Sequence, residues 1–159
     1  MDAFFRLTRS KFKFKLYLLT NLPAAFFAGL RVTKADTNSC IIMVPYRWST
    51  RNPFRSIYFA CLAMAAEMST GILAMANTYK SDPRVSMLVV NMEAGFTKKA
   101  TGRTRFTCED GKSIREAVER AKATGEAQMI KTRSVGTLDT GEIVAEFFIS
   151  WSFKAKSKG

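Results

Sequence analysis

The spacing of apolar and polar positions changes along the chain and predicts a mixture of helices and strands. Residues 57–76 are apolar on every side, and Glu67 is their only carboxylate. A soluble helix without a polar face is one that other elements cover. The run is also long enough to span a membrane, but a carboxylate at mid-bilayer is costly. We therefore favour a buried core helix over about residues 56–78 and expect no integral membrane segment.

Strands are predicted before and after this helix. Six segments combine strand-forming residues with bounding turns: residues 30–36, 39–46, 85–97, 103–108, 127–138 and 142–153. In the last segment, apolar side chains alternate without a break from Ile143 to Phe153, which is the period of a strand with one buried face. An antiparallel sheet with its helices on one side is an α+β architecture. A sheet that curls around a single buried helix is the hotdog arrangement.

Further helices are predicted outside this core. We expect the basic residues 2–19 to form one or two short helices that cover part of the core with six apolar side chains: Phe4, Phe5, Leu7, Phe12, Phe14 and Leu16. The stretch resembles a secretion signal only superficially, because Pro23 interrupts its apolar part. Ser113 and Glu116 have the spacing of a capping box for a helix that Gly125 can end. We treat residues 1–159 as one domain, with residues 1–22 as a helical extension and residues 26–154 as the hotdog core.

Composition narrows the chemistry. The chain has no histidine, which excludes Ser-His-Asp and Cys-His catalysis and every histidine-ligated metal site. Its three cysteines lack the spacing of a metal or redox motif, and an odd number suits a reducing cytoplasm better than a disulfide framework. We therefore expect a cytoplasmic protein without metal or cofactor, whose chemistry depends on carboxylates, hydroxyls, amides, lysines or backbone groups.

The net charge of +12 suggests a polyanionic partner such as anionic lipid or coenzyme A, although charge also serves solubility alone. The sequence contains no nucleic-acid-binding motif, and we expect no nucleic-acid partner. The N-terminal stretch is both cationic and rich in Phe, so a role at a membrane surface is a further alternative.

Glu67 lies within a stripe of small residues on the predicted core helix. Apart from Met64, its neighbours on the helical wheel are small: Ser56, Ala60, Ala63, Thr70, Gly71, Ala74 and Thr78. Such a stripe lets another backbone or a slender ligand approach closely. A buried carboxylate is costly unless it is paired, hydrogen bonded or neutral. Glu67 is therefore either an ion pair with a basic side chain of the core or of a partner subunit, or a general base or nucleophile in a cleft.

The segment NPFRSIYFACLAMAAEMSTG, residues 52–71, resembles the central-helix signature of hotdog thioesterases of the phenylacetyl-CoA thioesterase-like group. In that group an Asn precedes a helix-opening Gly-x-x-His-Gly-Gly, and an acidic residue follows at the spacing that separates Asn52 from Glu67. FTKKATG, residues 96–102, is similar to the strand segment that follows in those enzymes. The resemblance covers most of residues 26–154, and the additional helices are similar to those of an uncharacterised branch of the superfamily.

The resemblance implies a hydrolase that acts on acyl-CoA or on an acyl carrier protein. It also implies a homodimer, or a dimer of dimers, with active sites at the subunit interface. Glu67 would activate the attacking water or attack the thioester itself, and Asn52 would hold the water or the substrate carbonyl. The backbone N–H groups of Phe59 and Ala60 would stabilise the oxyanion.

Four more residues are expected to bind substrate: Tyr58, Thr70, Lys98 and Lys99. Lys98 and Lys99, with Arg103 and Arg105 nearby, can meet the phosphates of coenzyme A or an acidic carrier protein. The same basic residues also fit a solvated strand edge that lysines protect from aggregation.

The chain departs from the family pattern just before Glu67. Arg55 stands where the helix-opening Gly is usual, and three residues replace His-Gly-Gly: Tyr58, Phe59 and Ala60. Phe59 and Ala60 carry Cβ atoms where Gly lets the substrate approach. Asn52 precedes Pro53, and Asn-Pro is a common turn pair, so Asn52 has a structural interpretation as well. A non-catalytic hotdog dimer that binds acyl thioesters, or serves a structural role, is therefore the alternative to a hydrolase.

Overall fold

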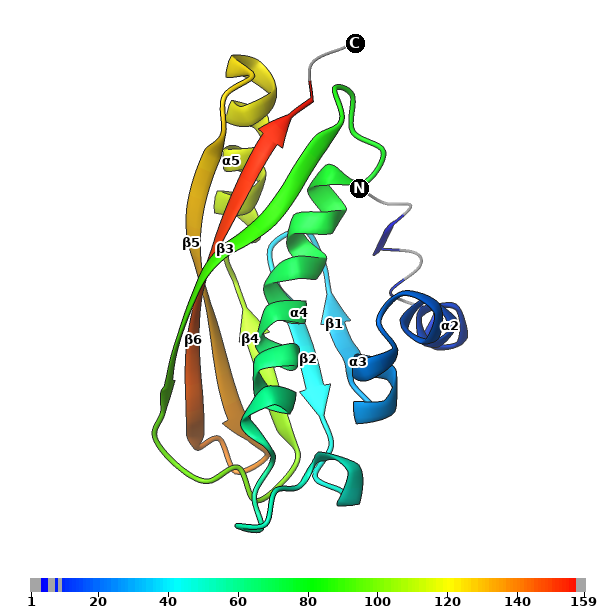
Figure 1. The fold of residues 1–159 in the computed structure, drawn as a ribbon, viewed down its shortest axis with the longest axis vertical. Helices are drawn as coiled ribbons and strands as arrows, with labels where there is room; N and C mark the ends of the chain where they lie inside the picture. The colour runs from blue at the N-terminus through cyan, green and yellow to red at the C-terminus, as the bar shows by residue number, and fades with distance from the viewer. Residues whose placement is uncertain (1–3, 6–7, 9, 157–159) are drawn as a thin grey trace.

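A curved sheet of six strands wraps around one long helix in the computed structural model, which describes residues 4–5, 8 and 10–156 (Figure 1). The strands are β1 (Arg31–Ala35), β2 (Cys40–Val44), β3 (Val85–Phe96), β4 (Thr104–Cys108), β5 (Gln128–Leu138) and β6 (Ile143–Ala155). Their order is β1-β2-β4-β5-β6-β3, and all neighbours are antiparallel. All six predicted strands are confirmed, and each end agrees within two residues. The protein has the α+β hotdog fold.

Helix α4 (Phe59–Thr78) is the core helix of this fold. Its length and hydropathy would also suit a membrane span, but 67% of its most apolar window is buried within the protein, which favours the interpretation as a core helix. The prediction of a helix without an exposed face is wrong along one stripe. Ala63, Met64 and Glu67 are only half-buried, and Phe59 is exposed. The sheet covers the bulky side of α4 and leaves the start of the small-residue side open.

The core between α4 and the sheet depends on the alternation in β6. Ala145, Phe147, Ile149, Trp151 and Phe153 are all buried, as their spacing predicts. Ile143, predicted to belong to the same face, is instead 48% exposed. It is the first residue of β6, beside a shift in the β5–β6 register, where the chain enters the sheet from a turn.

Two short helices lie between residue 10 and the first strand. Helix α2 (Lys11–Asn21) ends two residues before Pro23, which opens α3 (Pro23–Ala28), because proline suits the first turn of a helix and breaks its interior. Phe4, Phe5 and Phe14 are buried as predicted, whereas Leu7 lies outside the described residues. Two further predictions of burial in this segment are wrong.

Those two residues are Phe12, which is 78% exposed, and Leu16, which is 52% exposed. Helix α2 lies against the core with one side only (Figure 1), so its apolar residues cannot all be covered.

Helix α5 (Gly111–Thr124) begins earlier than predicted, because Asp110 occupies the N-cap position and Ser113 lies inside the helix. The capping box is therefore wrong. The Asp110 carboxylate instead accepts a hydrogen bond from the backbone N–H of Arg133 at 2.6 Å, which joins the start of α5 to β5. Gly125 ends the helix in the left-handed conformation, with φ of 72°, as predicted.

Candidate functional site

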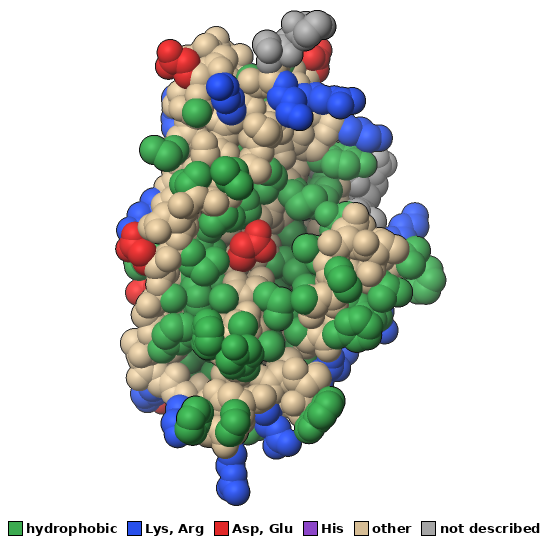
Figure 2. Space-filling view, viewed as in Figure 1, with side chains coloured by type: hydrophobic (Ala, Val, Ile, Leu, Met, Phe, Trp, Pro, Cys, Tyr) green, Lys and Arg blue, Asp and Glu red, His purple; other side chains and the backbone are tan. Residues whose placement is uncertain are grey.

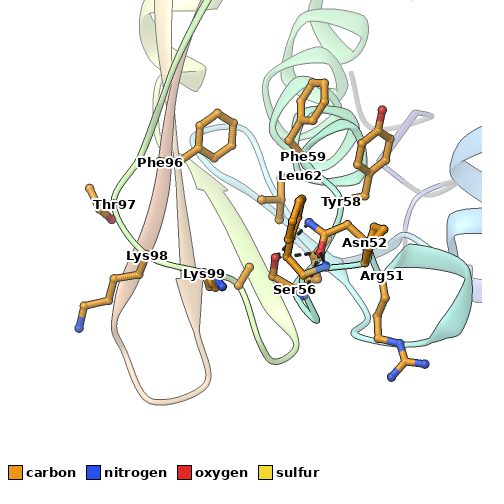
Figure 3. A pocket seen from close by; sticks show the side chains of 14 residues that line it. Arg51, Asn52, Ser56, Tyr58, Phe59, Leu62, Phe96, Thr97, Lys98 and Lys99 are labelled. Atoms are coloured by element: carbon orange, nitrogen blue, oxygen red, sulfur yellow. Dashed lines mark hydrogen bonds between the residues drawn. The ribbon is translucent and has the colours of Figure 1, made fainter.

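A pocket of about 710 Å³ opens where α4 begins. Its walls come from residues 51–54 and 56–58, from Phe59 and Leu62 of α4, and from residues 96–100. Figure 3 shows Phe96, at the end of β3, on the opposite side of the pocket from Phe59 and Leu62. Aromatic and aliphatic walls with a few polar groups are typical of sites for small organic molecules.

Asn52 lines this pocket but uses its side chain locally. Its Oδ1 accepts hydrogen bonds from the backbone N–H groups of Phe54 at 3.0 Å and Ser56 at 3.1 Å, and its Nδ2 lies 3.1 Å from the Ser56 hydroxyl oxygen (Figure 3). This is the pattern by which Asn stabilises a turn. In this arrangement Asn52 shapes the loop before α4, and its amide is already engaged.

Arg55 lies in the same turn, at the position where the family pattern has Gly. Its φ is 59°, within the left-handed region that glycine adopts without steric cost. The Tyr46 hydroxyl donates a hydrogen bond to the Arg55 carbonyl at 2.9 Å and supports this conformation. The turn is thus retained although its usual residue is absent.

The first turn of α4 supplies backbone donors beside the pocket. The N–H groups of Cys61 and Leu62 donate to the Tyr58 carbonyl at 2.9 and 3.3 Å. The N–H groups of Phe59 and Ala60 precede them and have no hydrogen-bond partner among the described residues. Such groups at a helix N-terminus attract negative charge. Phe59 lines the pocket, whereas Ala60 does not.

Tyr58 also lines the pocket and is 46% exposed. Its ring packs edge-on against that of Phe59 at 4.9 Å between centroids. A backbone hydrogen bond joins the loop before α4 to the segment of residues 96–100, because the N–H of Ile57 donates to the carbonyl of Ala100 at 2.8 Å.

The basic residues near the pocket differ in how they are engaged. Lys98 pairs with Glu142 and points away from the pocket in Figure 3. Arg103 and Arg105 both pair with Asp139, so the structure accounts for them as part of an ion-pair network at the surface. Lys99 forms no ion pair with a described residue and lines the pocket.

Glu67 lies elsewhere, on the half-buried stripe of α4. Figure 2 shows an acidic group surrounded by hydrophobic side chains over the middle of this helix, where Glu67 is the only acidic residue. Burial raises the pKa of its carboxyl above the ordinary value of 4.5. No described basic side chain pairs with it. The alternative of an ion pair within the described chain is therefore wrong.

Gly71 makes room for this carboxylate. A Cβ atom at position 71 would lie 3.0 Å from Oε1 of Glu67 and 3.5 Å from the ring of Trp151. Thr70, next to it, is fully buried and donates to the Glu67 carbonyl at 2.9 Å while it accepts from the Trp151 indole at 3.0 Å. Its hydroxyl holds α4 against β6, so substrate binding by Thr70 would require these hydrogen bonds to break.

The expected site residues thus fall into two places. Asn52, Tyr58, Phe59 and the two lysines line the pocket, whereas Glu67 does not. Glu67 lies five residues beyond Leu62, the last residue of α4 that lines the pocket, which corresponds to about 7.5 Å along a helix. Within one copy of the chain, Glu67 therefore lies outside the pocket.

Nine of the fourteen residues that line the pocket were not among the predicted site residues, and Arg51, Leu62 and Phe96 are three of them. Phe96 reaches the pocket because β3 pairs with β6 along its whole length and ends beside the start of α4. No local pattern marks such a residue, since its position depends on strand pairing. Leu62 has the spacing of a core residue and is largely buried, so its contact with the pocket has no sequence signal either.

Comparison with known proteins agrees with this fold. The model of a domain of unknown function, DUF4442, matches residues 11–152, so the chain belongs to this family. No curated protein matches its sequence.

Solved structures resemble the chain over nearly its whole length. A Pseudomonas aeruginosa protein of unknown function, a probable thioesterase, shares 23% identity with a TM-score of 0.76, over 91% of this chain and 95% of its own. A Chlorobaculum tepidum protein of unknown function shares 17% identity at the same TM-score, over 91% and 93%. A Haemophilus influenzae thioesterase shares 11% identity with a TM-score of 0.64, over 90% of each chain. At these identities the likeness shows the fold alone.

Proposed function

We propose that the protein hydrolyses acyl thioesters, with Glu67 as the general base. The observation that carries this proposal is the Glu67 carboxylate, which is desolvated on the open stripe of α4 and forms no ion pair with a described residue. A carboxylate in such a place destabilises the fold and calls for a functional reason. One structural relative is described as a thioesterase and another, of unknown function, as a probable thioesterase, which supports the proposal of the same chemistry here.

The site we propose is shared between two copies of the chain. Strand β3 is an edge of the sheet, and its exposed apolar side chains include Leu88, Val90 and Met92. A long apolar edge strand invites pairing with another strand. A homodimer formed there would cover this edge and set the open stripe of each α4 against the other copy. Glu67 of one copy would then serve the pocket of the second.

The chemistry needs only groups that the chain supplies. The acyl group lies against Phe59 and Phe96, and its carbonyl oxygen approaches the N–H groups of Phe59 and Ala60. Glu67 of the second copy removes a proton from water as the oxygen attacks the carbonyl carbon. The two N–H groups stabilise the resulting oxyanion. As the C–S bond breaks, the proton passes from Glu67 to the departing thiolate, which yields a carboxylic acid and a thiol.

The surroundings of the pocket favour a coenzyme A thioester as the substrate. Lys99 and Arg51 line it and can meet phosphate groups, and its aromatic walls suit an acyl or aryl chain. A phenylacetyl group is within this class, in line with the resemblance of residues 52–71. A cytoplasmic location fits the three unpaired and buried thiols.

The test measures thiol release from acetyl-, octanoyl-, palmitoyl-, benzoyl- and phenylacetyl-CoA. We expect the wild type to hydrolyse at least one, and Glu67→Gln to lower kcat by about 100-fold to 10,000-fold, as is usual for loss of a general base. Glu126→Gln is the matched control, because Glu126 is exposed and forms no ion pair with a described residue.

A binding protein without hydrolysis is the second candidate. Two features favour it: the Asn52 amide is already engaged with Ser56 and is not free to hold a water or the substrate carbonyl, and the Cβ atoms of Phe59 and Ala60 restrict the approach of that carbonyl. Acyl-CoA binding that Glu67→Gln leaves unchanged, with no turnover of any substrate by the wild type, would establish this candidate and exclude the hydrolase.

A further inference from the structure

Helix α2 has a second apolar side that no described residue covers. Phe14 and Leu18 are only 6% and 2% exposed and pack into the core. Phe12, Leu16 and Leu19 lie on the other side, with exposed fractions of 78%, 52% and 42%. Their spacing of four and three residues places them on one helix face. The exposed side is therefore an ordered apolar stripe rather than scattered surface residues.

The neighbouring elements also carry exposed aromatic side chains. Phe27 of α3 is 66% exposed, and Trp48 of the short helix η1 (Trp48–Thr50) is 85% exposed. The Lys15 ammonium of α2 lies 5.7 Å from the ring centroid of Phe26 in α3. The Arg47 guanidinium, next to η1, donates to the Phe27 carbonyl at 2.7 Å. These contacts hold α2, α3 and η1 next to one another.

We call the exposed part of these elements the α2–α3–η1 surface and define it by five exposed apolar residues: Phe12, Leu16, Leu19, Phe27 and Trp48. Figure 2 shows hydrophobic side chains over the α2 and α3 region at the right of the view, with basic side chains around them. Lys13 and Lys15 are exposed and flank the α2 stripe on its two sides.

Positive charge is concentrated in this part of the chain. Residues 3–66 contain ten basic residues and a single acidic one, Asp36. The basic residues are Arg6, Arg9, Lys11, Lys13, Lys15, Arg31, Lys34, Arg47, Arg51 and Arg55. This stretch therefore carries nine of the twelve net positive charges of the protein.

We propose that the α2–α3–η1 surface docks on a bilayer that contains anionic phospholipid. An apolar stripe flanked by lysines is the pattern of helices that lie in the membrane interface, and exposed Trp is favoured at that depth. Anionic headgroups attract nearby Lys and Arg side chains. A second copy of the chain fits less well, because a two-fold contact would bring the same positive charges face to face. The docking does not depend on thioester hydrolysis.

The experiment is co-sedimentation of the full-length protein with phosphatidylcholine vesicles made with and without phosphatidylglycerol. We expect sedimentation with the anionic vesicles only, and less of it as salt screens the attraction. Protein that stays in the supernatant with anionic vesicles at low salt overturns the proposal.

Two double variants separate the charge from the apolar stripe. Lys13→Glu with Lys15→Glu, and Phe12→Ser with Leu16→Ser, are each expected to weaken vesicle binding about tenfold or more. All four side chains are exposed, so neither change should unfold the protein.

Matched controls change comparable side chains elsewhere. Lys112→Glu with Lys154→Glu makes the same change of charge on α5 and β6, and Met129→Ser removes a side chain that is 71% exposed on β5. We expect near-normal binding of both controls. Equal losses in the controls and in the α2 variants would contradict docking through this surface.

Trp48 provides a direct readout, because the other tryptophan, Trp151, is only 3% exposed. Its emission should shift to the blue on addition of anionic vesicles, and Trp48→Phe should remove the shift. A different result would show that a second copy of the chain covers the surface and that the proposal is wrong. In that case the wild type does not bind anionic vesicles, and Phe12→Ser with Leu16→Ser lowers the mass of the assembly in sedimentation velocity.

Discussion

Two regions of helix α4 differ in almost every physical property. Its first turn borders a pocket with aromatic walls, free backbone N–H groups and the cationic side chains of Arg51 and Lys99. Two turns further on, Glu67 lies among apolar side chains, and no basic side chain in the described part of the chain pairs with it. The first region can bind an anionic or polarised ligand, and the second can hold a base with a raised pKa. Each lacks what the other supplies, which is why we propose that two copies complete one site.

The largest expected effect is the recovery of activity in mixed dimers. Phe59→Asp places a charge in the wall of the pocket, and Glu67→Gln removes the base, so each variant alone should be inactive. In a shared site, a mixed dimer has one site with both changes and one intact site. Two differently tagged variants, coexpressed and purified through both tags, should regain activity, and an unselected mixture should reach about a quarter of the wild-type rate.

If Glu67 and the pocket of one chain formed the site, every site in the mixed dimer would carry one change. The mixed dimer would then be no more active than a dimer in which both copies carry Glu67→Gln. That result would contradict a site shared between the two copies.

Gly71→Ala should separate the position of the Glu67 carboxylate from the stability of α4. The added methyl group would lie 3.0 Å from Oε1 of Glu67, so this flexible carboxylate must move. We expect kcat to fall about tenfold to a hundredfold, since small displacements of catalytic groups have effects of this size. Alanine should also stabilise the helix by about 0.5–1 kcal/mol. A clear fall in Tm together with the fall in kcat would show that the variant disturbs packing instead.

Thr70→Val tests whether Thr70 belongs to the site or to the core. The change leaves the Trp151 indole N–H without its partner, and a buried unpaired donor costs about 1–3 kcal/mol of unfolding free energy. We expect that loss in chemical denaturation, with kcat and KM close to wild type. Thr78→Val is the control, because the hydroxyl of Thr78 is only half-buried and its loss should have a smaller effect. A change in KM without a change in stability would support Thr70 as a substrate-binding residue.

The smallest effect concerns pH. Because burial raises the pKa of Glu67 above 4.5, the folded state binds its proton more tightly than the unfolded state does. The stabilisation that protonated Glu67 contributes is complete below about pH 4.5 and is lost as pH rises through the raised pKa. As pH rises from about 4.5 through the raised pKa, the Tm of the wild type should fall relative to that of Glu67→Gln. Over the same interval kcat/KM of the wild type should rise, because the general base becomes deprotonated. Parallel Tm curves for the two proteins would contradict a desolvated carboxylate.

Much of the fold could be predicted because it depends on repeating local patterns. The alternation in β6 and the unbroken apolar run of α4 both required a partner surface, and together they specified a sheet around a helix. Where a local sequence pattern and a tertiary contact favoured different structures, the structure followed the tertiary contact. Asp110 bonds to the backbone of β5 and begins α5 before the predicted cap at Ser113.

The sequence by itself determined that Glu67 is the one carboxylate on a core helix and that no histidine can take its place. Only the tertiary structure decided where the helix is uncovered, because the curvature of the sheet shields the bulky side of α4 and leaves Glu67 half-buried. Strand pairing also brought Phe96 to the pocket, and one-sided packing left the second face of α2 exposed. These outcomes depend on which elements meet in space, and helical or strand periodicity carries no information about that.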